Sequence, residues 1–252
     1  MTLPDAFLRI PIAHRALHGA GAPENSLAAV RAAVAAGYGI EIDVQPSSDG
    51  VAMVFHDYVL DRLTAESGPV EAQSAAELGA IRLDGTAEGI PTLAEVLQAV
   101  GGAVPLLIEI KDQDGAMGPE IGGLQAAVAR ALKGYDGPVA VMSFNPHAVA
   151  EMARLAPEIP RGLTTCGWDH GARRALPAQR RDELASIPDY DRVGACFISH
   201  NRHDLTRPRV AELKARGVPV ISWTIRSEAE EAEARKLADN ITFEGFAAAH
   251  PA

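Results

Sequence analysis

The sequence predicts an α/β fold of the (β/α)8 type, a TIM barrel, with a small insertion after the second barrel strand. Short apolar runs alternate with alanine-rich helical segments along the chain, a pattern typical of a parallel sheet covered by helices. The number of apolar runs, roughly eight, favours a closed barrel over an open doubly wound sheet. No Gly-x-Gly-x-x-Gly motif follows the first run, which argues against a dinucleotide-binding fold.

Length and composition favour one domain. The chain has 252 residues, 47% of them apolar, which is enough to bury a full core. We therefore expect a single barrel domain over residues 1–252. The stretch from about 58 to 91 does not follow the alternation of strands and helices, so we interpret it as the insertion.

The elements can be placed in order from apolar runs and helix caps. We expect strands at residues 9–14, 39–44, 51–55, 105–111, 139–144, 162–165, 195–199, 219–225 and 240–243. We expect helices at residues 26–36, 92–100, 118–132, 146–155, 178–186, 207–216 and 227–237. Many of these helices open with Ser, Thr, Asn or Pro and several end at Gly, as capped helices do.

Two of the predicted strands carry charged residues that packing alone does not explain. Residues 40–43 read Ile-Glu-Ile-Asp, and residues 108–111 read Ile-Glu-Ile-Lys. Because side chains alternate between the faces of a strand, Glu41 and Asp43 share one face, and Glu109 and Lys111 share another. Burying several such charges without a ligand or a metal costs several kcal/mol each. The two runs therefore indicate a functional site.

More polar residues fall at the same end of the predicted barrel. His14 and Arg15 end the first strand, His56 follows the run at 51–55, and Trp223 lies late in the run at 219–225. Glu244 follows the last strand. In barrels of this type the chemistry lies at the carboxyl ends of the strands, so we expect these side chains to share one rim.

The residue types indicate a metal-assisted reaction on a phosphate. Glu41, Asp43 and Glu109 offer hard oxygen ligands that suit a divalent cation, Mg²⁺ or Ca²⁺, and no His or Cys cluster has zinc spacing. His14 and His56 are suited to act as acid and base near neutral pH. Cationic side chains at the rim, those of Arg15 and Lys111, could neutralise an anion. Together these groups indicate phosphoryl transfer.

Charge and composition limit the partners. The formal charge of −10 argues against nucleic acid or an anionic membrane surface as the main partner. No stretch approaches the apolar length of a membrane span, and the N-terminus does not resemble a signal peptide, so we expect no membrane insertion and a cytoplasmic protein. Cys166 and Cys196 are interpreted as reduced, buried thiols.

A series of short motifs closely resembles the signature of the glycerophosphodiester phosphodiesterases. The motifs are His14-Arg15, Pro23-Glu24-Asn25-Ser26, Glu41-Ile42-Asp43-Val44, Asp49-Gly50, His56-Asp57 and Glu109-Ile110-Lys111. Their order and spacing agree with the family over residues 10–111, and the barrel rhythm with Trp223 extends the likeness over most of the chain.

The resemblance implies a fold, an activity and residue roles. The family folds as a (β/α)8 barrel with a small insertion and uses a divalent cation to hydrolyse glycerophosphodiesters to sn-glycerol 3-phosphate and an alcohol. By this resemblance, His14 and His56 would be the acid/base pair, and Arg15 and Lys111 the phosphate contacts. Glu41, Asp43 and Glu109 would be the metal ligands, while Trp223 would either line the glycerol pocket or fill the barrel mouth.

The chain departs from the family pattern at two places. Ala16 stands where the family usually has Gly after His-Arg, and Phe243-Glu244-Gly245 replaces the usual Thr-Asp followed by Pro. Both departures concern the substrate pocket rather than the metal centre. The other polar residues have plainer interpretations: His18, His200 and His203 as surface-loop residues, and Asp57 as a turn residue.

Two other functions compete with the phosphodiesterase. One is an aldolase-type barrel in which Lys111 forms a Schiff base, although the neighbouring carboxylates favour a protonated lysine. The other is a barrel that binds phosphate without catalysis, which the intact histidine pair argues against. The departing alcohol is not determined by the sequence.

Overall fold

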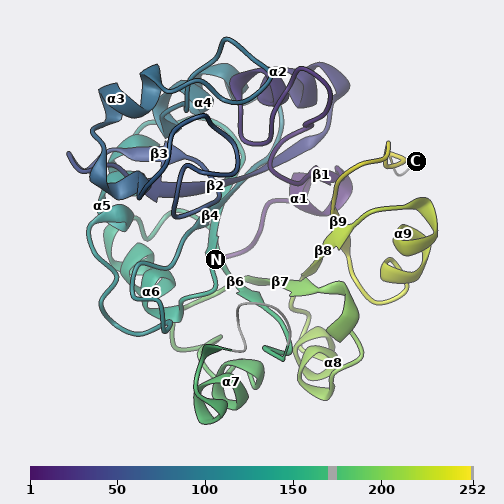
Figure 1. The fold of residues 1–252 in the computed structure, drawn as a ribbon. Helices are drawn as coiled ribbons and strands as arrows, with labels where there is room; N and C mark the ends of the chain where they lie inside the picture. The colour runs from purple at the N-terminus through teal and green to yellow at the C-terminus, as the bar shows by residue number, and fades with distance from the viewer. Residues whose placement is uncertain (170–174, 251–252) are drawn as a thin grey trace.

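A computed structural model describes residues 1–169 and 175–250. Residues 170–174 and 251–252 of the domain predicted over residues 1–252 lie outside the described residues. Within the described residues, eight parallel strands form a closed ring with helices around it (Figure 1). In chain order the parallel strands are β1 (Ile12–Ala13), β2 (Gly39–Pro46), β4 (Leu106–Ile110), β5 (Val139–Ser143), β6 (Arg161–Thr165), β7 (Phe197–Asn201), β8 (Val220–Ile225) and β9 (Asn240–Phe243). The pairing of β1 with both β2 and β9 closes the ring, so the predicted (β/α)8 barrel is confirmed.

Helices connect successive strands on the outside of the ring. They are α2 (Leu27–Ala36), α4 (Leu93–Val100), α5 (Leu124–Leu132), α6 (Pro146–Leu155), α7 (Ala178–Ala185), α8 (Pro208–Ala215) and α9 (Glu228–Ala234). The caps expected from the sequence are present on several of them. The Ser26 hydroxyl accepts a hydrogen bond from the Ala29 N–H, and α2 ends at Gly37 in the left-handed conformation.

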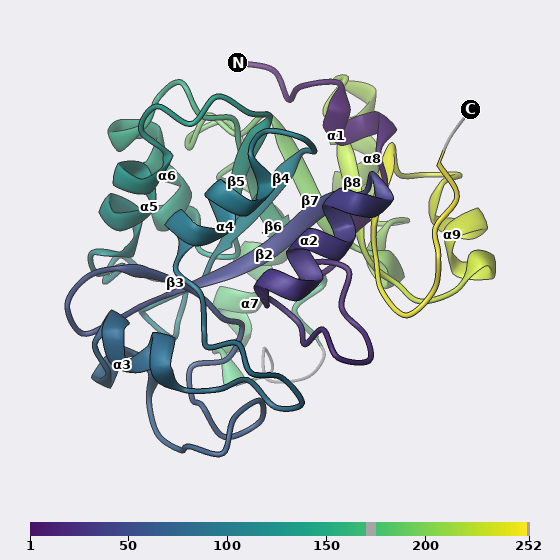
Figure 2. The same ribbon diagram turned by 90° about the horizontal axis from the view of Figure 1, so that it is seen from above.

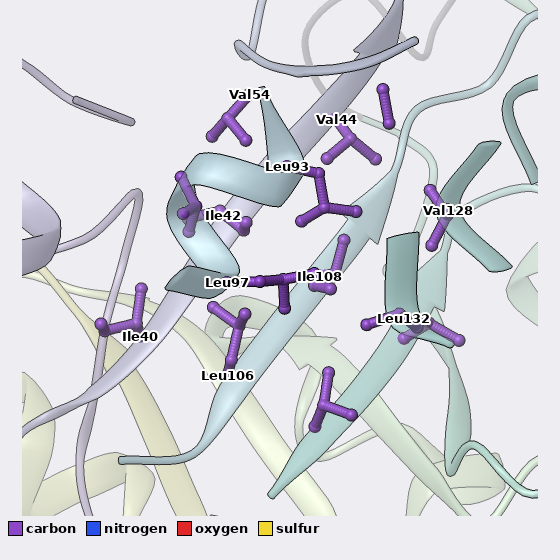
Figure 3. Packing of buried hydrophobic residues seen from close by; sticks show 14 of the residues in the cluster. Ile40, Ile42, Val44, Val54, Leu93, Leu97, Leu106, Ile108, Val128 and Leu132 are labelled. Atoms are coloured by element: carbon purple, nitrogen blue, oxygen red, sulfur yellow. The ribbon is translucent and has the colours of Figure 1, made fainter. Parts of the chain in front are cut away.

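The alternation along β2 and β4 directs their apolar and charged residues to opposite sides. The side chains of Ile40, Ile42, Leu106 and Ile108 pack in one buried cluster with residues of α4 and α5, outside the ring (Figure 3). Full burial of each such side chain contributes about 1.5–3 kcal/mol. Because neighbours in a strand face opposite sides, the intervening carboxylates point into the barrel.

The amino-terminal end of the barrel is closed by a short helix that the sequence did not predict. Residues 9–14 were expected to be a strand, but α1 (Ala6–Arg9) precedes β1, which covers only Ile12 and Ala13. The physical reason is that Phe7 of α1 is fully buried against inward residues of the barrel, including Leu107 and Phe197. The Asn240 amide donates to the Phe7 and Ile10 carbonyls and holds α1 there.

The helix predicted at residues 118–132 begins only at Leu124. The cause is Asp114, whose carboxylate accepts hydrogen bonds from the backbone N–H groups of Gly118 and Glu120. These donors bind a side chain instead of helical carbonyls, so the segment before Leu124 forms a turn.

The insertion after β2 has its own small core. The strand β3 (Ala52–Val54) pairs antiparallel with β2, and η1 (Val70–Ala72) and α3 (Ala75–Ala80) follow. Buried apolar residues, among them Phe55, Leu60 and Leu78, form a separate cluster here. Figure 2 shows α3 and α1 toward opposite ends of the barrel.

Among the described residues, we find no helix with the length and apolar character needed to cross a membrane. Cys166 and Cys196 are both buried, and no disulfide joins them, as predicted.

Candidate active site

A cavity of about 390 Å³ lies at the carboxyl ends of the strands and brings together the side chains predicted from the sequence. Its lining includes His14, Arg15, Glu41, Asp43, His56, Glu109, Lys111 and Trp223. These residues come from β2, β4 and β8, from the segments that follow β1 and β4, and from the start of the insertion. The closure of the barrel therefore collects groups that are up to about two hundred positions apart in the chain.

Three buried carboxylates form a compact group in this cavity. Asp43 of β2 is paired in register with Glu109 of β4, and Glu41 lies two residues before Asp43 on the same face. One oxygen of each carboxylate lies within 4.8 Å of the others. Three hard oxygen donors at this separation fit a divalent cation.

The Lys111 ammonium partly balances these carboxylates. Its Nζ lies 2.6 Å from Asp43 Oδ1 and 2.6 Å from Glu109 Oε1. Burial opposes the charged form of Lys111, but the two carboxylates prevail and raise its pKa. Burial likewise opposes the ionisation of Asp43, yet Lys111 lowers the pKa of Asp43.

Among the residues that the structure describes, no cationic side chain forms an ion pair with Glu41. Burial raises the pKa of Glu41 well above its ordinary value, and the nearby Asp43 and Glu109 carboxylates add to the rise. Its Oε2 accepts a hydrogen bond of 2.9 Å from the Arg15 backbone N–H. An added positive charge at this point would stabilise the ionised carboxylate.

The turn after β1 positions Arg15 beside the carboxylates. Both Arg15 and Ala16 have left-handed backbone conformations, with φ of 54° and 64°. This geometry explains why a glycine suits the second position, and here the buried Ala16 adopts it instead. The Arg15 Nε lies 3.6 Å from Asp43 Oδ2, and its Nη1 donates to Glu24 at 2.8 Å.

Asn25 belongs to one of the motifs, but the sequence did not indicate its role beside Asp43. Its side-chain amide donates to Asp43 Oδ2 at 3.0 Å, and its Oδ1 accepts from the Asp43 backbone N–H at 3.2 Å. Asn25 is buried and also has a left-handed φ of 59°. The two bonds fix the orientation of the Asp43 carboxylate.

Each of the two histidines contacts a carboxylate through Nδ1. His14 Nδ1 lies 2.6 Å from Glu244 Oε2, and His56 Nδ1 lies 2.5 Å from Asp57 Oδ1. These contacts leave Nε2 of each ring for a ligand. Burial, followed by the charge of Lys111, lowers the pKa of His56 from its ordinary value of 6.5, so the neutral ring is favoured near pH 7.

Asp57 is therefore more than the turn residue expected from the sequence. Its Oδ2 accepts from Arg62 Nε at 2.6 Å, and Arg62 also binds Glu24 through both terminal nitrogens at 2.9 and 2.7 Å. Glu24 in turn accepts the bond from Arg15. A continuous chain of ion pairs thus links the insertion to the turn after β1.

Another part of the cavity wall comes from β8 and from the residues around β7. Trp223 lines it, its Nε1 donates to the Ser199 carbonyl at 2.9 Å, and its ring packs edge-on against Phe144 at 5.6 Å. His203 also lines the cavity, whereas His200 is fully buried on β7. The interpretation of His200 as a surface-loop residue is therefore wrong.

Comparison with known proteins supports the phosphate chemistry that the site geometry indicates. The model of the glycerophosphoryl diester phosphodiesterase family matches residues 14–242. The chain belongs to this family. A glycerophosphodiester phosphodiesterase from Caldanaerobacter subterraneus subsp. tengcongensis is 30% identical over 227 residues, which cover 85% of this chain and 84% of that protein.

Solved structures of family members share the barrel. A phosphodiesterase from Oleispira antarctica, in complex with the product sn-glycerol-3-phosphate, is 27% identical with a TM-score of 0.77, and the match covers 95% of this chain and 94% of the other. A glycerophosphodiester phosphodiesterase from Agrobacterium tumefaciens is 26% identical with a TM-score of 0.66, covering 92% and 94%.

Proposed function

We propose that this protein hydrolyses glycerophosphodiesters to sn-glycerol 3-phosphate and an alcohol, with one divalent cation and two catalytic histidines. The observation that carries the proposal is the convergence of the three buried carboxylates with His14 and His56 in one cavity. Membership of the family supports the reaction class, a phosphoric diester hydrolase. We propose residues 1–252 as a single catalytic domain and a small-molecule diester as its substrate.

Glu41, Asp43 and Glu109 would hold the cation, Mg²⁺ or Ca²⁺. When bound, the cation would offset the negative charge of the phosphate and of the carboxylates. Arg15 and Lys111 add positive charge beside the same carboxylates, and a guanidinium can hold two phosphate oxygens at once. Trp223 would contact the organic part of the substrate.

The histidines would move the protons. One histidine removes the proton from the glycerol 2-hydroxyl, whose oxygen then attacks phosphorus. The bond from phosphorus to the alcohol oxygen breaks, and the other histidine donates a proton to that oxygen. Water then opens the cyclic phosphate with the two roles exchanged. Direct attack by water would need the same acid and base.

The two competing functions have weaker support. A Schiff base requires a neutral amine, but Asp43 and Glu109 raise the pKa of Lys111 and keep it protonated. A barrel that binds phosphate without turnover needs no histidine pair, yet both rings are held at Nδ1 by carboxylates.

The decisive test is a product assay with a panel of glycerophosphodiesters carrying choline, ethanolamine, glycerol or inositol. We expect turnover with Mg²⁺ or Ca²⁺ and loss of turnover with a chelator. His14→Ala and His56→Ala should each lower kcat by about 10²-fold or more while the protein stays folded. His147→Ala, which changes a histidine of α6 outside the cavity lining, serves as the control and should keep full activity.

Full turnover by a variant lacking both His14 and His56 would refute the proposal. Tight binding of the diesters by the wild-type protein without turnover would favour the non-catalytic barrel. Borohydride trapping of a carbonyl compound on Lys111 would favour the aldolase-type enzyme.

A further inference from the structure

Glu244 lies immediately after β9, where the chain departs from the family pattern. Its backbone N–H donates to the Ile225 carbonyl at 2.9 Å, at the end of β8. Its side chain is largely covered, with 19% of the surface exposed. The backbone of Glu244 is thus fixed between the ends of β8 and β9, and its covered side chain has little freedom to turn.

The Glu244 carboxylate binds the His14 ring. Its Oε2 lies 2.6 Å from His14 Nδ1, which is a short hydrogen bond to a charged acceptor. The His14 backbone is held as well, because its N–H donates to the Phe243 carbonyl at 2.8 Å. The residues at the end of β9 therefore fix both the main chain and the ring of His14.

Arg226 holds the other oxygen of the same carboxylate. Its Nε and Nη2 lie 2.7 and 2.6 Å from Glu244 Oε1, so Oε2 stays available to His14. His18 Nε2 lies 3.8 Å from Oε2, the oxygen that His14 binds. The hydrogen bond from His14 is the main reason that the pKa of Glu244 is lowered, which keeps Glu244 an ionised acceptor.

His56 has an equivalent arrangement built from a different part of the chain. Asp57 Oδ1 binds His56 Nδ1, and Arg62 binds the opposite oxygen, Oδ2. At both histidines, therefore, a carboxylate contacts Nδ1 through one oxygen and an arginine through the other. Because the same arrangement occurs independently at both histidines of the cavity, we infer that the two carboxylates act on their rings in the same way.

We propose that Glu244, held by Arg226, is a positioning residue for His14. It accepts a hydrogen bond from the protonated Nδ1 and so keeps Nε2 as the nitrogen that exchanges a proton with the substrate. The proposal rests on the proposed function, since it assumes that His14 acts as an acid or a base. It assigns a specific role to Glu244 in the segment 243–245, where the sequence differs from the family pattern.

The test compares Glu244→Gln with the wild-type protein by steady-state kinetics and by ¹⁵N NMR of the histidine rings. Gln has the same size but no charge, so it does not select a protonated Nδ1. We expect kcat to fall about 10- to 100-fold with KM changed less than about 3-fold. The His14 signals, assigned by their loss in His14→Gln, should change from the Nδ1–H form toward the Nε2–H form.

The matched control is Glu151→Gln, which removes a surface carboxylate that also binds an arginine, Arg154. This variant should leave kcat and the His14 signals unchanged. An unchanged His14 tautomer in Glu244→Gln would overturn the proposal, as would an unchanged kcat. If the wild-type protein has no diesterase activity, a tautomer change in Glu244→Gln still supports the positioning role, and only the proposed function fails.

Discussion

Lys111 has a structural role beside its proposed role in phosphate binding, and removing the side chain would affect both. Its ammonium contacts Asp43 and Glu109, and all three groups are buried. Removing one partner of a buried ion pair leaves an uncompensated charge, which destabilises a protein by about 3–5 kcal/mol. A loss of activity after substitution of Lys111 would therefore not distinguish phosphate binding from folding. The histidines are better test positions because they are only partly buried.

His200 leads to a prediction about stability and pH. The ring is fully buried on β7, where Nδ1 contacts Thr165 Oγ1 at 2.7 Å. Burial lowers the pKa of His200 from 6.5 to about 4. Between these values the unfolded chain binds more protons than the native protein, so the free energy of unfolding falls as the pH falls from 6.5 to 4. At 1.36 kcal/mol per pKa unit, the loss is about 3 kcal/mol.

Urea unfolding at pH 7 and at pH 4.5 checks this prediction. His200→Gln lacks the titrating group, so we expect its stability to change less over this interval than that of the wild-type protein. His250→Gln, which changes an exposed histidine, serves as the control and should follow the wild-type curve. Equal losses in His200→Gln and the wild-type protein would show that other groups cause the acid effect.

The sequence predicted residue identities better than residue partnerships. The strand alternation and the motifs led to Glu41, Asp43 and Glu109, which lie together in the structure. The bond between His14 and Glu244 joins residues 230 positions apart, and no local pattern connects them. Such partners depend on the closure of the barrel, which sequence spacing alone does not describe.

At the scale of elements, the pairing of β6 with β7 depends on a position without a side chain. Gly162 is paired in register with Phe197, and a Cβ atom built at Gly162 would lie 2.5 Å from the Phe197 ring. We expect Gly162→Ala to destabilise the protein by about 1–3 kcal/mol, because the buried ring cannot move freely.

A double-mutant cycle checks the cause of this loss. Phe197→Leu removes the ring and should itself cost about 1–2 kcal/mol. If the clash is the reason, Gly162→Ala should destabilise the Phe197→Leu protein by less than it destabilises the wild-type protein. Additive effects in denaturant unfolding would contradict the explanation.

Two elements that the sequence misplaced have different physical causes. A strand was predicted at residues 9–14 and a helix at 118–132 from local composition. The helix α1 forms instead because Phe7 packs at the amino-terminal end of the barrel, and α5 starts late because Asp114 binds backbone donors. Helices with clear caps, such as α2 and α6, were predicted within one residue. Local signals thus located these capped helices, but they did not reveal α3, although Ser74 and Glu77 form a capping box at its start.

At the scale of the whole molecule, the carboxylate group couples the proposed metal to folding. Glu41 and Asp43 belong to β2 and Glu109 to β4, and these strands are joined only by the insertion and α4 along the chain. The three oxygens come together only when β2 and β4 pair in the folded protein, so a cation that binds them binds the folded protein and stabilises it.

We therefore expect Mg²⁺ or Ca²⁺ to raise the Tm of the wild-type protein. At a free concentration of about 100 times Kd the gain is about 2.7 kcal/mol, or roughly 5–10 °C for a protein of this size.

Glu109→Gln should lose most of this shift, since it removes one ligand and its charge. Glu231→Gln changes another buried carboxylate, paired with Arg235 on α9, and should keep the shift even if its own Tm is lower. Thermal unfolding with a chelator and with added cation measures all three proteins. Equal shifts in Glu109→Gln and the wild-type protein would place the bound cation somewhere other than the carboxylates of β2 and β4.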